Sequence, residues 1–204
     1  MKGAGTECLA QAVRQMTPDE QAYTWRALKF YKDEFKQSKP SPGAAAGVHR
    51  LIDESVRELM GRPRADEVKC RKGCNHCCRQ HVDITHAEAK LLHLAAGDIG
   101  YPIDRAKLQR QSQYDYKNWA DQPAQDRSCV FLTPEGSCAV YEHRPMACRK
   151  YFVLSDPDLC DIVKHPGQEV LNFVSMEAEI VASAAIQAFG MNSLPTALLK
   201  SWPK

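Results

Sequence analysis

The stretch CRKGCNHCC, residues 70–78, places four cysteines within nine residues. Three residues separate Cys70 from Cys74, two separate Cys74 from Cys77, and Cys78 follows directly. Thiolates held within about 4 Å repel one another, so a bound cation or an iron–sulfur cluster is the physical reason for gathering them. The stretch therefore predicts a metal-binding loop around which the rest of the chain must fold.

A second group of three cysteines follows further along the chain, beginning with the run CVFLTPEGSCAVY at residues 129–141. A proline early and a glycine late at positions 133–136 predict a tight turn, so that a small β-hairpin brings the cysteines at its two ends together. The Arg-Pro step before Cys148 starts a new turn or helix beside them, and the two groups can then converge on one site. The predicted metal ligands are Cys70, Cys74, Cys77, Cys78, Cys129, Cys138 and Cys148.

Two further cysteines stand apart from this pattern. Cys160 lies on a short predicted helix that starts after Pro157, and Cys8 lies near the N-terminus, where chains are often mobile. Eight clustered thiols would permit two four-thiolate sites, whereas seven would not. We expect Cys160 to lie outside the ligand set, so that its replacement by serine leaves the metal stoichiometry unchanged.

The N-terminal residues MKGAGTECLAQAVRQMTPDE contain neither the apolar run nor the small-residue cleavage site of a secretory signal. We therefore expect a cytoplasmic protein. Thiols stay reduced in the cytosol, where a dense cysteine pattern indicates metal binding or catalysis rather than a disulfide framework.

The composition is that of a globular chain of 204 residues, with 44% hydrophobic and 25% charged residues. No apolar run approaches the ~18 residues of a membrane-spanning helix. The formal net charge is +2, which favours neither a nucleic-acid partner nor an acidic one. We expect no membrane association and no nucleic-acid partner, while a protein partner stays open.

Several stretches carry helix signals. Thr17, followed by proline and two acids, predicts the N-cap of a helix that runs to about Lys36. Apolar residues at three- and four-residue steps within it predict one core-facing side. These residues are Tyr23, Ala27, Phe30, Tyr31 and Phe35.

Further along the chain, residues 38–47 predict a proline- and glycine-rich break, and residues 48–59 an amphipathic helix. Thr85 and Glu88 have the spacing of a capping box, and Asp104 is placed to cap another helix.

A largely apolar helix is predicted from about Glu169 to Phe189, ended by Gly190. The chain shows no internal repeat and no alternation of strands with helices. The predicted fold is mainly α: a single helical domain with one small β-hairpin, wrapped around a cysteine-rich metal site. Its predicted parts are an N-terminal helical segment (1–67), a cysteine-cluster metal-binding domain (68–152) and C-terminal helices that pack on the same core (153–204).

Residues 68–152 resemble the YkgJ-like cysteine-cluster family, also known as the zinc- or iron-chelating CxxCxxCC domain. The resemblance rests on the first cysteine stretch and on the later run Cys-x-x-Tyr-x-x-Arg-Pro-x-x-Cys-Arg that ends at Arg149. Ala139 and Val140 stand where the family usually has an aliphatic pair. The resemblance implies a metal-binding or iron–sulfur module of largely unassigned role. Similar modules occur in flagellin lysine N-methylases, which are considerably longer chains.

The identity of the metal is a separate question. Adjacent cysteines chelate one tetrahedral ion poorly, whereas an iron–sulfur cluster offers separate irons, so we prefer a cluster to zinc. Zinc could also use His76, His81 or His143 as nitrogen ligands. The spacing of the first three cysteines also resembles that of radical S-adenosylmethionine enzymes, but those enzymes need alternating strands and helices that this chain lacks.

Three classes of function fit these observations. The first is a metal-binding protein without turnover of its own, and the second is a metal-dependent protein-modifying enzyme related to flagellin lysine N-methylase. The third is a structural zinc module for interaction with another macromolecule. The sequence contains no glycine-rich phosphate or S-adenosylmethionine loop and no nucleophile triad that would support the second class. Whether the protein is an enzyme stays open.

Overall fold

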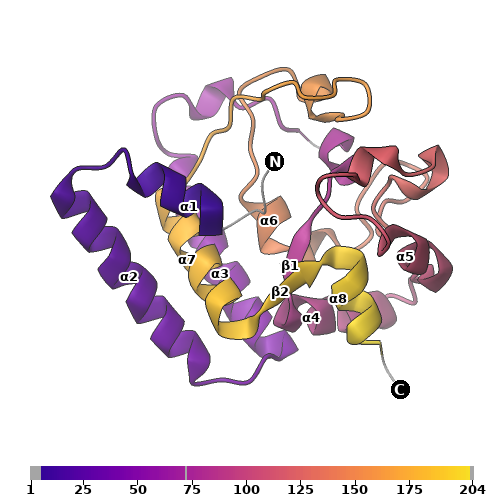
Figure 1. Ribbon diagram of the computed structural model, residues 1–204, viewed down its shortest axis with the longest axis horizontal. Helices are drawn as coiled ribbons and strands as arrows, with labels where there is room; N and C mark the ends of the chain where they lie inside the picture. Colours follow the sequence, from indigo (N-terminus) through magenta and orange to yellow (C-terminus); the bar gives the residue numbers. More distant parts are fainter. Residues whose placement is uncertain (1–5, 72, 203–204) are drawn as a thin grey trace.

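The computed structural model describes residues 6–71 and 73–202, and this part of the chain is mainly helical with one small antiparallel sheet, as predicted (Figure 1). None of the helices in these residues combines the length and apolar character needed to cross a membrane. The helices are α1 (Thr6–Val13), α2 (Pro18–Lys36), α3 (Pro42–Leu59), α4 (His86–Asp98), α5 (Arg105–Gln111), α6 (Met146–Arg149), α7 (Met176–Phe189) and α8 (Leu194–Lys200). The strands are β1 (Asp83–Thr85) and β2 (Met191–Ser193).

Helix α2 begins where the sequence predicts it, at the Thr17 capping box. The Thr17 hydroxyl accepts a hydrogen bond from the backbone of Glu20, whose carboxylate in turn accepts one from the Thr17 amide at 2.8 Å. The predicted aromatic core face is only partly correct, because Tyr23 and Phe30 are 58% and 61% exposed. The side facing α7 instead runs through buried Thr24 and Leu28, which turns Tyr23 and Phe30 away.

The other two aromatic residues of the predicted stripe, Tyr31 and Phe35, do pack against the core. The ring of Phe35 lies 5.9 Å from that of Phe189 at the end of α7. Helix α2 therefore packs along α7 through Leu28 near its middle and through Tyr31 and Phe35 nearer its C-terminal end.

Two other predicted boundaries are wrong. The break over residues 38–47 is shorter, because Ser41 caps α3 and Pro42 occupies its first position, so the following small residues are helical. Helix α7 starts at Met176, where Ser175 forms the cap, and not at Glu169. Its predicted end at Gly190 is confirmed by a φ of +70°.

The sheet joins two segments that are far apart in the chain. Strand β1 pairs antiparallel with β2, so that Asp83 faces Ser193 and Thr85 faces Met191. Within the predicted hairpin, the structure has a single bridge between Leu132 and Cys138. The turn forms there as predicted, but the flanking residues do not extend into strands.

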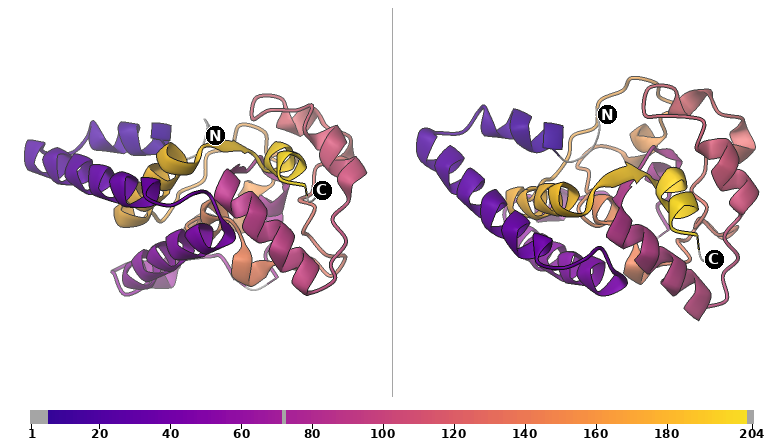
Figure 2. Two further views of the ribbon diagram at one scale, coloured as in Figure 1. Left: turned by 90° about the horizontal axis from the view of Figure 1, so that it is seen from below. Right: turned by 60° about the horizontal axis from the view of Figure 1, so that its bottom comes forward.

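Helices α2 and α3 diverge from the loop that joins them, and α7 packs against both (Figure 2). Helix α4 packs on α3 on one side and on α8 on the other. The loops near residues 62–80 and 150–172, which carry many of the cysteines, run together beyond the end of α6 (Figure 1). The helices thus form a scaffold with the cysteine loops at one end. The predicted boundaries at residues 67/68 and 152/153 stay a prediction.

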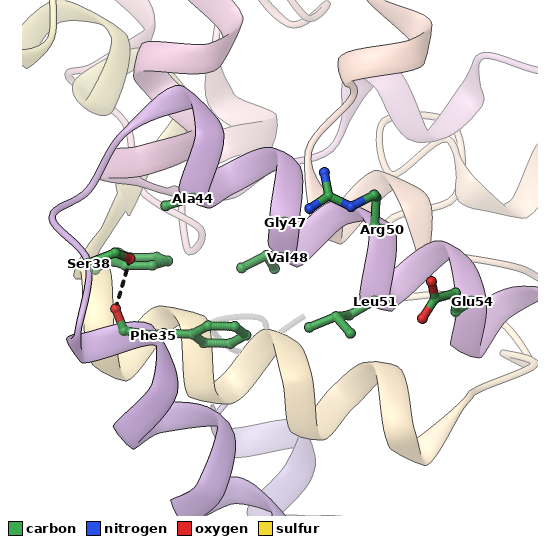
Figure 3. A pocket seen from close by; sticks show the side chains of 9 residues that line it. Phe35, Ser38, Ala44, Gly47, Val48, Arg50, Leu51 and Glu54 are labelled. Atoms are coloured by element: carbon green, nitrogen blue, oxygen red, sulfur yellow. Dashed lines mark hydrogen bonds between the residues drawn. The ribbon is translucent and has the colours of Figure 1, made fainter.

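A shallow hollow of about 330 Å³ lies where α2 and α3 approach each other (Figure 3). Phe35, Val48 and Leu51 form its apolar floor, and Arg50 and Glu54 lie at its edge. None of the described residues that line it is a cysteine. The hollow is therefore separate from the chemistry of the cysteine loops.

Candidate metal centre

The first cysteine group lies in a compact loop that ends in the 3-10 turn η2 (His76–Arg79). The amide of Cys74 donates to the carbonyl of Arg71 at 3.0 Å, and the amide of Cys78 donates to that of Asn75 at 3.0 Å. Gly73 has a φ of +87°, a conformation that glycine adopts without strain. These short-range bonds fix the backbone of the loop, and its four cysteines are partly exposed.

The second group is joined to the first by main-chain and side-chain hydrogen bonds. The amide of Cys129 donates to the carbonyl of Cys78 at 2.8 Å. The Asn75 amide group donates to the carbonyl of Gly136 in the turn that leads to Cys138, at 3.1 Å. Because both bonds reach the η2 region, the structure places the turn directly beside the first cysteine loop.

Cys148 is positioned by the short helix α6, which a buried carboxylate anchors. Glu88 of α4 is 1% exposed and accepts a hydrogen bond from the Met146 amide at 2.6 Å. The same carboxylate contacts His49 of α3 at 3.1 Å and completes the Thr85 capping box. The start of α6 is therefore tied to two long helices at once.

The end of α6 is anchored by a second buried group, the guanidinium of Arg149. This side chain donates to the carboxylate of Asp53 at 2.6 Å and to the carbonyl of Arg144 at 2.9 Å, and it also donates to the carbonyl of Glu142. The structure thus gives Arg149 the role of holding the backbone around Cys148. Arg144 lies instead against the exposed ring of Tyr141, 4.1 Å from its centroid.

Cys160 lies against the first cysteine loop, although the sequence pattern excludes it from the ligand set. It ends the 3-10 turn η6 (Pro157–Cys160), which packs on η2, and it is 3% exposed. The amide group of Gln80 donates to the Cys160 carbonyl at 2.9 Å. Asp158 in the same turn lies 3.7 Å from Nδ1 of His76.

The thiols of the two groups also affect one another's pKa values. Burial raises the pKa of Cys138 and of Cys148, and the nearby charge of Cys77 raises both further. Burial likewise raises the pKa of Cys129 to about 11, with Cys138 and Cys77 adding to the effect. An ionised thiol acts on its neighbours over about 10 Å in salt solution. Thiols from both segments therefore share one small region.

The pair Cys77 and Cys78 lies at the centre of this region. The Cys77 thiol donates a hydrogen bond to the neighbouring Cys78 side chain, and this bond together with burial raises the pKa of Cys77 far above its ordinary value. Cys148 is exposed as a residue, whereas desolvation raises the pKa of its thiol well above the ordinary value. Neutral thiols of this kind give up their protons when they bind a metal.

The residues present fit a thiolate-bound metal by their donor chemistry. A buried nitrogen, Nδ1 of His76, has no hydrogen-bond partner among the described residues, although it lies next to Cys77 in sequence. At the same time, within residues 6–71 and 73–202 no three His, Cys, Asp or Glu side chains are close enough to hold a single ion.

The other two histidines considered from sequence are placed differently. The ring of His81 packs edge-on against Trp119, with centroids 5.2 Å apart, and its Nδ1 lies 3.9 Å from Asp83. His143 is exposed at the end of the 3-10 turn η5 (Tyr141–His143). Cys8 lies in α1, outside the side chains that the structure describes.

Comparison with protein families identifies the segment that holds these loops. Residues 69–166 match the family model named CxxCxxCC, which is described as a putative zinc- or iron-chelating domain. We call this matched segment the CxxCxxCC domain after the family model. The match confirms the predicted resemblance to this family. No curated protein and no solved structure matches the chain.

The CxxCxxCC domain covers a little under half of the chain. It extends beyond the predicted limit at residue 152 and includes Cys160. Helices α1, α2, α3, α7 and α8 lie outside it, yet α3 supplies His49 and Asp53 to the anchors of α6. The position of Cys148 thus depends on residues beyond the family match.

Sequence reasoning misses these anchors. The predicted capping-box role of Glu88 is confirmed, but one carboxylate oxygen also reaches Met146, 58 residues away. The signal that points to this second role is the position of Glu88, an acidic residue on a side of α4 that is otherwise apolar. Gln80, directly after the first loop, carries no signal for its contact with Cys160.

Proposed function

We propose that the CxxCxxCC domain holds an iron–sulfur cluster, with zinc as the alternative occupant. The observation that carries the proposal is the close approach of the two cysteine segments, in which the Cys129 amide bonds the Cys78 carbonyl at 2.8 Å and Asn75 bonds the carbonyl of Gly136 at 3.1 Å. Cysteines that served only as small apolar residues would not need to share one region. The proposed ligands are Cys70, Cys74, Cys77, Cys78, Cys129, Cys138 and Cys148.

The number of gathered thiols favours a cluster over a single zinc ion. Zinc requires four donors at ~2.0 to 2.3 Å around one centre, whereas seven cysteines lie in the two segments. A cluster presents several irons, so each thiolate can bind at its own corner. The adjacent thiols of Cys77 and Cys78 also suit separate irons better than one ion.

Nδ1 of His76, which makes no hydrogen bond with the described residues and lies 3.7 Å from Asp158, supports zinc as the second candidate. Zinc accepts mixed thiolate and imidazole ligands, and a structural zinc site would stabilise the loops without any redox role. In that case the zinc ion would hold the cysteine loops rigid, and the helices would form the surface that contacts a protein partner. The two candidates predict different colours, because zinc sites do not absorb visible light.

We further propose that the metal is held in a cytoplasmic protein without catalytic turnover of its own. The hollow of Figure 3 lies between α2 and α3, and none of its described lining residues is a cysteine. A bound cluster would supply one-electron chemistry or a store of iron. The domain's own residues would hold and orient it.

The test is anaerobic purification of the full chain, followed by iron, zinc and sulfide analysis and an absorbance spectrum. A cluster should give brown protein with absorbance near ~400 nm, and iron with matching sulfide. A colourless protein with stoichiometric zinc would support the second candidate. A chain that binds neither metal, even after anaerobic reconstitution, would contradict the proposed function.

A further inference from the structure

Helix α2 lies at one edge of the molecule, with one side packed on α7 and α1 (Figures 1 and 2). Thr24 and Leu28 are buried on that side, whereas the rings of Tyr23 and Phe30 lie outside it and are 58% and 61% exposed. Two large aromatic rings on the outer side of one helix indicate a surface that another molecule covers.

The charges on this outer face are arranged symmetrically around Phe30. Tyr23, Arg26, Phe30 and Glu34 follow one another at three- and four-residue steps, so they share one face of the helix. Arg26 precedes Phe30 by four residues and Glu34 follows it by four. Opposite charges therefore lie about 6 Å along the helix on either side of the ring.

Both charged groups are available for a partner. Arg26 and Glu34 are exposed, and within residues 6–71 and 73–202 the Arg26 guanidinium has neither a hydrogen bond nor an ion pair. Glu34 accepts one hydrogen bond, from the Gln37 amide group at 3.1 Å. The neighbouring acid Asp33, by contrast, already pairs with Lys29 at 2.6 Å.

This arrangement is complementary to itself. A two-fold axis through Phe30 and perpendicular to α2 places a second copy of the helix antiparallel to the first. Phe30 then meets Phe30 of the second copy, and Arg26 lies opposite Glu34 of that copy at both ends of the contact. Tyr23 lies opposite Gln37, whose amide can bond the tyrosine hydroxyl.

We propose that this face of α2 binds the same face of a second copy of the chain, antiparallel and centred on Phe30. A contact made by one helix of 19 residues is smaller than a standard protein interface, so the dimer should be weak, with a Kd on the order of 10–100 µM. The contact uses no residue of the CxxCxxCC domain. The inference is therefore independent of the proposed metal binding.

The test measures the mass of the full chain by sedimentation equilibrium, at concentrations up to about 500 µM. We expect a monomer–dimer equilibrium in the unsubstituted protein. Arg26→Glu places two acids opposite each other at both ends of the contact, and Glu34→Arg places two bases there. Each change should weaken association at least about tenfold, because like charges face each other twice. Phe30→Ser should weaken it as well.

Mixing the two charge variants gives the decisive measurement. In a mixed dimer of Arg26→Glu and Glu34→Arg chains, opposite charges face each other again at both ends, so the mixture should associate although neither variant does alone. The double variant Arg26→Glu/Glu34→Arg should likewise recover self-association. The matched control is Arg57→Glu, an exposed charge reversal on α3, which should associate like the unsubstituted chain.

Three results would overturn the inference: a monomer at every concentration, a dimer that neither charge variant weakens, or single variants that fail to associate when mixed. Because the substituted side chains are exposed, the variants should keep the circular dichroism spectrum and melting temperature of the unsubstituted chain. Bound metal should also be the same in all of them. A chain without metal that still dimerises would contradict the proposed function and leave this inference standing.

Discussion

The backbone amide of Cys129 donates a 2.8 Å hydrogen bond to the carbonyl oxygen of Cys78. This bond joins the two cysteine groups through main-chain atoms, which no thiol substitution removes. The neighbouring bond from Asn75 to the carbonyl of Gly136 likewise involves no sulfur. The loops can therefore stay side by side when a single ligand is lost.

This arrangement predicts that single serine variants lose metal before they lose the fold. Serine is close in size to cysteine but is a poor ligand for zinc or iron. We expect Cys74→Ser to lower the bound metal by half or more, with an unchanged far-ultraviolet circular dichroism spectrum. Cys8→Ser, outside the CxxCxxCC domain, should retain all of its metal. Equal metal content in the two variants would contradict the ligand assignment.

Removal of the metal should loosen the cysteine loops and leave part of the helical scaffold. Binding free energy becomes folding free energy when ligands gather only around the metal. Among the described residues, two of the three apolar cores, those that hold α7 against α1, α2 and α3, contain no cysteine. After chelation we expect faster amide hydrogen exchange over residues 68–152 and slow exchange in α7. An unchanged melting temperature after complete metal removal would argue against this coupling.

The buried carboxylate of Glu88 predicts a pH-dependent contribution to stability. Desolvation raises its pKa, but the hydrogen bond and charge of His49 and the amides of Met146 and Thr85 lower it below its ordinary value. A carboxyl group with a lowered folded-state pKa stabilises the fold above its unfolded value of about 4.3. That stability is lost as the pH falls through the folded-state pKa.

We therefore expect Glu88→Gln to lower the free energy of unfolding by about 2–4 kcal/mol at pH 7. The difference from the unsubstituted chain should shrink as the pH falls below about 4. Urea denaturation at pH 7 and pH 3.5 measures both values. The matched control is Glu67→Gln, because Glu67 pairs with Arg64 at the surface and should contribute little. A loss of the same size at both pH values would show that the charge of Glu88 is not responsible.

The turn at Gly136 predicts a local effect on stability. Its φ is +79°, and an added Cβ would lie 2.5 Å from Nδ2 of Asn75. Gly136→Ala should destabilise the metal-free chain by about 1–3 kcal/mol, because it combines backbone strain with this close contact. The control Gly97→Ala lies in α4 with open space around it and should be neutral or stabilising by up to ~1 kcal/mol.

A double variant separates the two causes. In an Asn75→Ala background the close contact is absent, so Gly136→Ala should cost less than it does alone. Chemical denaturation of the four chains gives this coupling directly. An unchanged cost would attribute the whole effect to the backbone conformation and would contradict the role of the contact.

Local signals in the sequence predict the local structure well. The caps at Thr17, Thr85 and Asp104 all form, because each depends on residues three positions away. The predicted start of α7 is wrong because Val170 and Phe173 continue the apolar pattern of the helix in the sequence. In the structure the Phe173 amide instead donates a hydrogen bond to the carbonyl of Phe152. A contact between distant segments overrides the helical pattern there.

The sequence predicts which residues form the candidate site but not how they are arranged in space. Clustered cysteines reveal which residues to consider, because a reduced protein seldom gathers thiols this densely without a bound metal. The position of Cys160 depends on Gln80, and that of α6 on Glu88 and Asp53, all of them far away in the chain. Single-sequence patterns do not encode such pairings, and the same is true of β1 with β2.

Pairing of β1 with β2 has a consequence for the newly made chain. Strand β1 follows the first cysteine loop closely, but its partner Met191–Ser193 is synthesised long afterwards. Until β2 emerges from the ribosome, the strand that follows this loop lacks its partner. Metal delivered too early would therefore meet an unfolded segment that can bind it in the wrong arrangement, so the timing of delivery matters as much as its supply.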